Sequence, residues 1–273
     1  MKHNSLTNSS DSGIDSESKF IWHLLVSIIM LPFKLFLIPF KKAKFSDLSK
    51  PFILIKEFIV SAKFTFWIIV INIVVFIVSL FFSKEFFLSL ALRPQNLINF
   101  QFYTFITSAF LHASISHLLG NMLGILLFGR ILERKLGSLK TALIYFGAMI
   151  IASIFSCVIN LYLGIDVPGI GASGALMGLI SAAMLINPLY ITFELLIPIP
   201  VMMAGLVFIY ADIEGIISQS ADGIGHFVHL GGFISIAILG FVFGIADRKK
   251  LLFGLMINIV SAIVFFLLFF RPF

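Results

Sequence analysis

The chain has 273 residues, of which 60% are hydrophobic and 12% charged, and its mean hydropathy is +1.11. This composition excludes an ordinary water-soluble domain and is typical of proteins that cross a membrane several times. The single cysteine, Cys157, excludes an intrachain disulfide and a cysteine-rich zinc site. The net charge of +6 comes from bases beside apolar segments, which indicates contact with an anionic lipid bilayer and no nucleic-acid partner.

Two segments precede the main apolar region. Residues 1–19 are polar, contain acids and lack the basic start and cleavage site of a secretory signal, so they are expected to form a disordered tail. Residues 20–40 are apolar but contain Pro32 and Pro39, which favours an interfacial or re-entrant segment over a crossing helix. We therefore divide the chain into an N-terminal cytoplasmic region (1–63), a core (64–245) and an extra C-terminal transmembrane helix (246–273).

Seven stretches approach the length of about 20 mostly apolar residues that a membrane-crossing helix needs. The predicted fold is an all-α membrane protein, a polytopic helical bundle with a six-helix core and one C-terminal helix. Numbered one to seven, the predicted helices are Phe64–Phe82, His117–Leu132, Leu139–Leu163, Gly171–Ile186, Leu195–Ala211, His226–Ile245 and Leu251–Phe270.

The positions of Lys and Arg predict the orientation of these helices, because positive charge stays on the cytoplasmic side. The connection between helices five and six contains Asp212, Glu214 and Asp222 without a base and is expected outside. The N-terminus is expected in the cytoplasm, and the membrane is expected to be the cell membrane. The basic residues lie before helix one, between helices two and three, and between helices six and seven: Lys41, Lys42, Lys44, Lys50, Lys56, Lys63, Arg134, Lys135, Lys140, Arg248, Lys249 and Lys250.

Polar residues stand at the starts of three helices that should run in the same direction. His117 and Asn121 begin helix two, Ser173 begins helix four and His226 begins helix six. With this topology their side chains converge in one layer below the outer surface. Polar residues inside a membrane are costly and usually face the bundle interior, so this layer is a candidate functional site.

Ser173 and His226 have the chemistry of a nucleophile and its general base. A serine hydroxyl is a weak nucleophile until a neighbouring base takes its proton, and neutral imidazole suits that task near neutral pH. Ser173 also lies in the first turn of its helix, where free amide N–H groups and the positive dipole end favour a developing oxyanion. The pair therefore predicts acyl-transfer chemistry.

Other residues fit around this predicted pair. His117 and Asn121 are one helical turn apart, so their hydrogen-bond donors share a face and can complete the oxyanion site. Gly171 and Gly174 flank the serine and leave its backbone accessible. These four residues are predicted to bind the anion or to shape the loop.

Packing is the alternative interpretation of these residues. Gly174 and Gly178 form a small-xxx-small pair, which is common where transmembrane helices approach closely. His117 and Asn121 can also form hydrogen bonds between helices without any catalytic role.

A metal site is a further alternative for His226 and His229. The sequence offers no carboxylate or thiolate at a suitable depth, so neither a metal nor a cofactor is expected. His112, just before helix two, is predicted to be a structural hydrogen-bonding residue.

The motifs occur in a definite order: FYTFITSAFLHASISHLLGNM (102–122), FGRILERKLGS, GASG and GHFVHLGG. This ordered set resembles the rhomboid family of intramembrane serine proteases, over about residues 64–244. The resemblance implies that Ser173 is the nucleophile and His226 its base, in a dyad without a third carboxylate. It also implies that His117, Asn121 and the Ser173 amide stabilise the oxyanion.

The resemblance has further implications, and the sequence departs from the family pattern at Met177 and in the first loop at residues 102–104. Glu133 occupies the position of a structural glutamate, and His112 that of a histidine that braces the first loop. Met177 stands where many members have an aromatic residue packed on the catalytic imidazole, so it is expected to support that ring through its thioether.

The implied substrates are transmembrane segments of other proteins, cut near their outer ends, with helix five and the loop after it as a lateral gate. Two rival interpretations remain open. One is a catalytically inactive rhomboid-like protein that binds membrane helices. The other is a transporter or channel, although the sequence shows no repeated halves. The sequence predicts no oligomeric state.

Overall fold

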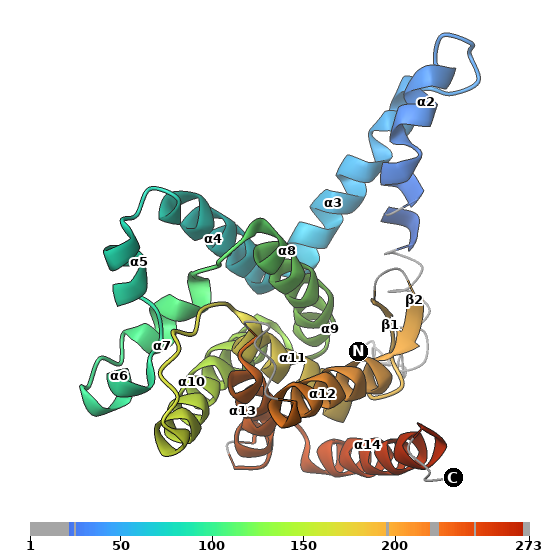
Figure 1. Cartoon of the computed structure of the whole chain (residues 1–273). Coiled ribbons are helices and arrows are strands. Elements are labelled where there is room, and N and C mark those ends of the chain that lie inside the picture. The colour runs from blue at the N-terminus through green and yellow to red at the C-terminus, as the bar shows by residue number, and fades with distance from the viewer. Residues whose placement is uncertain (1–21, 25, 195–196, 219–223, 243, 270–273) are drawn as a thin grey trace, which may run out of the picture. The chain divides into compact units, whose positions relative to one another are not determined.

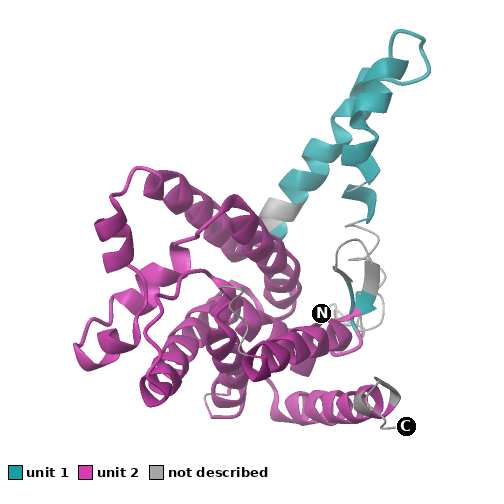
Figure 2. Cartoon of the chain, viewed as in Figure 1, with its two compact units in different colours: residues 1–61, 190–199 teal, residues 62–189, 200–273 magenta. Residues whose placement is uncertain are grey.

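The computed structural model is mostly helical (Figure 1), which confirms the predicted helical fold class. Contacts divide the chain into two compact units, residues 1–61 with 190–199 and residues 62–189 with 200–273 (Figure 2). The structure describes residues 22–24, 26–194, 197–218, 224–242 and 244–269.

The first unit contains part of the apolar segment predicted to lie at the membrane surface. Residues 20, 21 and 25 of that segment lie outside the described residues. Pro32 falls in the first turn of a short helix, where its missing N–H costs no intrahelical bond. The interfacial or re-entrant placement stays a prediction. The elements of this unit are α2 (Leu31–Leu37), the 3-10 turn η1 (Phe45–Leu48), α3 (Lys50–Ser61), and the strands β1 (Ile191–Glu194) and β2 (Ile197–Pro200).

The second unit contains the long helices. Two π-helical segments continue helices without a break, so η3 joins α8 to α9 and η4 extends α13. The elements are α4 (Lys63–Ser79), α8 (Ile115–Gly124), η3 (Ile125–Gly129), α9 (Arg130–Leu136), α10 (Ser138–Leu163), α11 (Ser173–Ile186), α12 (Val201–Ile217), α13 (His226–Ile236), η4 (Ala237–Val242) and α14 (Arg248–Phe269).

Helix five differs most from its predicted range. Pro198 and Pro200 favour extended backbone at the residues before them, so this stretch forms β2 and α12 begins only at Val201. The helix also continues to Ile217, which places Asp212 and Glu214 inside it. The prediction that these two acids belong to an outer loop is therefore wrong, and Asp222 lies outside the described residues.

The segment between α4 and α8 contains short helical turns that hydropathy did not predict. They are too short for a hydrophobic period to reveal them. Their backbone reaches the loop before α11 through a bridge between Leu92 and Gly169. The turns are α5 (Lys84–Ser89), α6 (Pro94–Ile98), α7 (Thr104–Thr107) and the 3-10 turn η2 (Ser108–Phe110).

Small residues let α10, α11 and α13 approach one another closely. A Cβ atom on Gly178 of α11 would lie 2.2 Å from the Cβ atom of Ala148 on α10. A Cβ atom on Gly232 of α13 would lie 2.3 Å from the carbonyl oxygen of Gly174 on α11. Packing at this distance is how helices associate where lipid removes the hydrophobic driving force.

Glu133 ties α9 to the start of α4. Its two carboxylate oxygens accept hydrogen bonds from the Phe64 amide at 2.8 Å and from the Thr65 amide at 2.9 Å. The hydroxyl groups of Thr65 and Ser138 also donate to it, at 2.8 and 2.6 Å. Glu133 is 4% exposed, so these donors offset the cost of burying its charge. The residue caps α4 and has the structural role that the sequence predicted.

The surface of the second unit is apolar along its helices. Trp67 is 60% exposed, Val158 is 49% exposed and Phe253 is 59% exposed, on α4, α10 and α14. Within the described residues, Ile115–Leu136 and Ser138–Leu163 are long and apolar enough to cross a membrane. Shorter apolar helices cover Lys63–Ser79, Ser173–Ile186 and His226–Val242. Lipid is the environment that such a surface fits.

Changing Gly178 to alanine should lower the thermal unfolding midpoint in detergent. The added methyl group would overlap Ala148, and overpacking of this kind costs about 1–3 kcal/mol. Gly120→Ala is the matched control, because a Cβ atom there meets nothing within 4 Å. Equal midpoints for the two variants would contradict the close-packing interpretation.

Changing Glu133 to glutamine should also destabilise the protein, because the amide nitrogen cannot accept a hydrogen bond. At least one donor at the start of α4 would lose its partner, at a cost of about 1–3 kcal/mol. The same change at Glu214, an exposed residue of α12, should leave the midpoint unaltered. A Glu133→Gln midpoint equal to that of wild type would show that the carboxylate does not hold α4.

Candidate active site

The loop before α11 holds Ser173 in a constrained position. Gly171 has a φ of +117°, a conformation that residues with a Cβ atom rarely adopt. Its amide donates to the carbonyl oxygen of Ser108 at 2.9 Å, so the loop is tied to the segment before α8. Ser173 is the first residue of α11 and is partly exposed. Its amide and the next ones have no partner within the helix and point to its N-terminal end.

His117 and Asn121 face this loop from α8. A Cβ atom on Gly171 would lie 2.6 Å from Nε2 of His117 and 3.5 Å from Nδ2 of Asn121. Ser114 caps the helix by accepting from the His117 amide at 3.1 Å. The Asn121 side chain is 5% exposed, and its Nδ2 atom has no acceptor among the residues that the structure describes. The structure therefore brings both side chains against the backbone that leads into Ser173.

His112 supports His117 from the turn before α8. The two rings are 5.1 Å apart between centroids and meet edge to face. His112 is 2% exposed. Burial, with a smaller contribution from the charge of His117, lowers the pKa of His112 to about 4. The ring is therefore neutral at physiological pH and packs as an uncharged brace.

Helix α13 carries two histidines, and they face different neighbours. Gly232 contacts the backbone of Gly174, so its face of α13 looks toward the start of α11. His229 precedes Gly232 by one helical turn and lies about 60° from it around the axis, whereas His226 lies about 120° away. His229 is thus nearer than His226 to the face of α13 that contacts α11.

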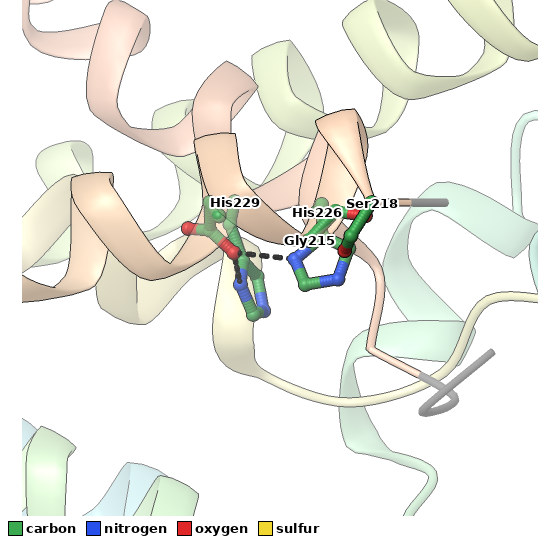
Figure 3. Close-up of polar contacts among 5 residues, drawn as sticks. Gly215, Ser218, His226 and His229 are labelled. Atoms are coloured by element: carbon green, nitrogen blue, oxygen red, sulfur yellow. Dashed lines mark hydrogen bonds and ion pairs between the residues drawn. The ribbon is translucent and has the colours of Figure 1, made fainter. Parts of the chain in front are cut away.

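His226 packs against α12 instead. A Cβ atom on Gly215 would lie 2.2 Å from Nε2 of His226, so the ring occupies the space that this glycine leaves (Figure 3). Among the described residues, no hydrogen bond joins His229 to the Ser173 hydroxyl. In unliganded enzymes such catalytic bonds are often long and shorten only when substrate binds.

Asp212 of α12 joins the two histidines. Its Oδ1 atom is 2.9 Å from Nδ1 of His226 and 2.9 Å from Nδ1 of His229, as the dashed lines in Figure 3 mark. The carboxylate is 5% exposed, and the two imidazole side chains are 10% and 12% exposed. Among the described residues, no group of three His, Cys, Asp or Glu side chains is arranged to hold a metal ion.

The partnership of Asp212 with His229 was not predicted from the sequence. Asp212 was expected in a loop, and His229 only as an alternative metal ligand. The sequence contains a sign of this partnership, because His229 precedes Gly232 by three residues and Asp212 precedes Gly215 by three. On a helix, residues three apart lie on the same face, so each polar side chain lies near a glycine where another helix can approach closely.

The remaining predicted site residues have packing positions. Gly174 lies against Ala152 and Val228, where a Cβ atom would meet their side chains at 3.0 Å. Met177 is 4% exposed, and a Cβ atom on Gly232 would lie 2.9 Å from its Cβ atom. Met177 therefore packs beside α13 one turn from His229.

Comparison with known proteins identifies the family of this chain. The family model described as the rhomboid domain matches residues 99–246. This chain belongs to the rhomboid family. Members of the family are membrane proteins, so this rhomboid is a membrane protein, in agreement with its apolar helices.

Three curated relatives are similar to this rhomboid. RHOMBOID-like protein 12, mitochondrial, of Arabidopsis thaliana is 28% identical over 60% of this chain and 54% of its own length. RHOMBOID-like protein 1 of the same plant is 35% identical over 50% of this chain and 33% of its own length. Rhomboid-like protease 3 of Toxoplasma gondii is 30% identical over 42% of this chain and 48% of its own length. The matched region spans about half of these relatives or less.

Changing Gly171 to alanine should destabilise this rhomboid more than the same change at Gly164. Both glycines have positive φ, +117° and +68°, where alanine costs about 1–2 kcal/mol. Only at Gly171 does the methyl group also meet His117, which adds about 1–3 kcal/mol of overpacking. Thermal unfolding of both variants in detergent measures the difference. An equal loss at the two positions would show that backbone strain alone is responsible.

Proposed function

We propose that this rhomboid is an intramembrane serine endopeptidase that cleaves transmembrane segments of membrane proteins near the outer membrane face. The observation that supports this most is the convergence on Ser173. The loop residue Gly171 lies against His117 and Asn121 on one side, and the Gly174–Gly232 contact brings α13 to the other.

In this proposal the hydroxyl of Ser173 attacks the scissile carbonyl carbon, and a histidine of α13 takes its proton. The negative charge that develops on the carbonyl oxygen is stabilised by the free amides at the start of α11 and by donors from His117 and Asn121. The histidine then protonates the leaving amine. Water releases the acyl group from Ser173 by the reverse sequence of proton transfers.

The geometry favours His229 over His226 as that base. His229 shares the α13 face that contacts α11, whereas the Nε2 atom of His226 lies against Gly215 of α12. The dyad of Ser173 with His226 that the sequence predicted remains the second candidate. The two assignments differ in which histidine is essential for turnover.

The proposed setting is a multi-pass arrangement in the cell membrane. In this proposal the six predicted core helices form the rhomboid core and α14 is a seventh transmembrane helix. The basic residues near α9 and α14 favour a cytoplasmic position for those ends and for the N-terminus. The substrate helix enters beside α12 and unwinds locally, because an intact helix hides the scissile carbonyl in its own hydrogen bonds.

A catalytically inactive relative that binds membrane helices is the second proposed function. It is compatible with the absence, among the described residues, of a hydrogen bond between Ser173 and His229. Labelling with a serine-directed fluorophosphonate separates the two functions. A protease labels at Ser173, and a binding protein does not.

Substitution of Ser173, His229 and His226 tests the proposal directly. Ser173→Ala and His229→Ala should each reduce the turnover of a transmembrane reporter in proteoliposomes by about 10³-fold or more, because each removes a group that bonds with the reacting atoms. His226→Ala should retain more activity than His229→Ala. Undiminished turnover in Ser173→Ala would end the proposal, and the reverse order of the two histidines would restore His226 as the base.

A further inference from the structure

Asp212 has a buried carboxylate, and one of its oxygen atoms is hydrogen-bonded to both histidines of α13. Each Nδ1 atom lies 2.9 Å from Oδ1, and the three side chains are almost fully shielded from solvent. Charge-assisted hydrogen bonds are stronger in such a site than in water. Figure 3 shows the two bonds that connect α12 with α13.

These bonds determine the positions of two protons. An ionised carboxylate accepts hydrogen bonds and cannot donate them, so each Nδ1 atom must carry its hydrogen. In a neutral imidazole the other nitrogen is then an unprotonated acceptor. Nε2 is therefore the basic atom of both rings.

We propose that Asp212 is a positioning residue that holds His229 in the tautomer and orientation needed to deprotonate Ser173. The inference rests on the proposed function, and it replaces the predicted dyad with a connected set of Ser173, His229 and Asp212. His226 donates to the same oxygen atom and helps to hold the carboxylate in place. Gly215 permits this, because any larger residue would occupy the place of the His226 ring.

The proton transfers balance without a further reactant. As the bond from the Ser173 Oγ atom to the carbonyl carbon forms, its proton moves to Nε2 of His229. The resulting imidazolium is stabilised by the Asp212 carboxylate, which keeps its charge and takes no proton. The same proton then passes to the leaving nitrogen as the carbon–nitrogen bond breaks. Water repeats the sequence and restores the free serine.

A purely structural carboxylate would be expected to use both of its oxygens. The Oδ2 atom of Asp212 is buried and accepts no hydrogen bond from the residues that the structure describes. Within the described part of the chain, Asp212 pairs with the two histidines and with no Lys or Arg. Burying a charge in this way is unfavourable for stability, so a neutral side chain of the same shape should be tolerated. A loss of turnover without a loss of stability is therefore the expected signature.

Asp212→Asn is the test variant, because it keeps the shape and removes the charge. Asp166→Asn is the matched control, since Asp166 is exposed and pairs with Arg93 at 3.1 Å. Both would be measured as full-length protein in proteoliposomes with a transmembrane reporter. Histidine-selective ¹⁵N NMR in detergent would report the tautomer of His229, assigned with His226→Gln.

In Asp212→Asn, kcat should fall by at least about 10-fold and by up to about 10⁴-fold, with KM and the unfolding midpoint near wild type, because the imidazole loses its preferred tautomer. Asp166→Asn should stay within about twofold of wild type. Wild-type His229 should show the hydrogen on Nδ1. A kcat for Asp212→Asn within about threefold of wild type, or a wild-type His229 with its hydrogen on Nε2, would overturn the inference.

The measurements separate the inference from the proposed function. If wild type fails to cut the reporter, or Ser173→Ala cuts it equally well, the proposed function fails. The tautomer of wild-type His229 can be measured without activity, so even then it shows whether the hydrogen lies on Nδ1, toward Asp212.

Discussion

The close approach of α11 to α13 is the constraint on which the rest of the site depends. Gly232 lies so near the carbonyl oxygen of Gly174 that no side chain fits between the two helices. Ser181 reinforces the contact by donating to the carbonyl oxygen of Phe233 at 2.9 Å. This contact sets the depth of α13 relative to the first turn of α11. His229, one turn before Gly232, is therefore closer than His226 to the face of α13 that contacts α11.

The second constraint is the loop that leads into α11. Backbone hydrogen bonds from Leu92 and Ser108 hold it to the segment before α8. Gly171 brings it against two side chains of α8 without a Cβ atom in between. A serine at a helix start is otherwise an ordinary feature of membrane proteins. Here the glycines on either side of it contact α8, α10 and α13.

Buried polar groups are costly in such an apolar bundle, and this rhomboid handles them in two ways. Glu133 is saturated with donors from the start of α4, which suits a group that only holds helices together. Asn121 and Asp212 each retain a buried polar atom without a partner among the described residues. Groups left incomplete in this way are candidates for chemistry, since a substrate can supply the missing partner.

The sequence by itself determined the membrane class of the chain, the approximate positions of its long helices and the polar residues that begin them, because hydropathy and local composition decide these features. It also contained the ordered motifs from which family membership was predicted and then confirmed by comparison. Only the tertiary structure decided that α12 contains Asp212, that this carboxylate binds both histidines, and that the ring of His226 fills the space beside Gly215 of α12. The physical reason is that side chains along one helix point in different directions around the helix axis. Which neighbouring helix each side chain meets depends on contacts made by residues far away in the sequence.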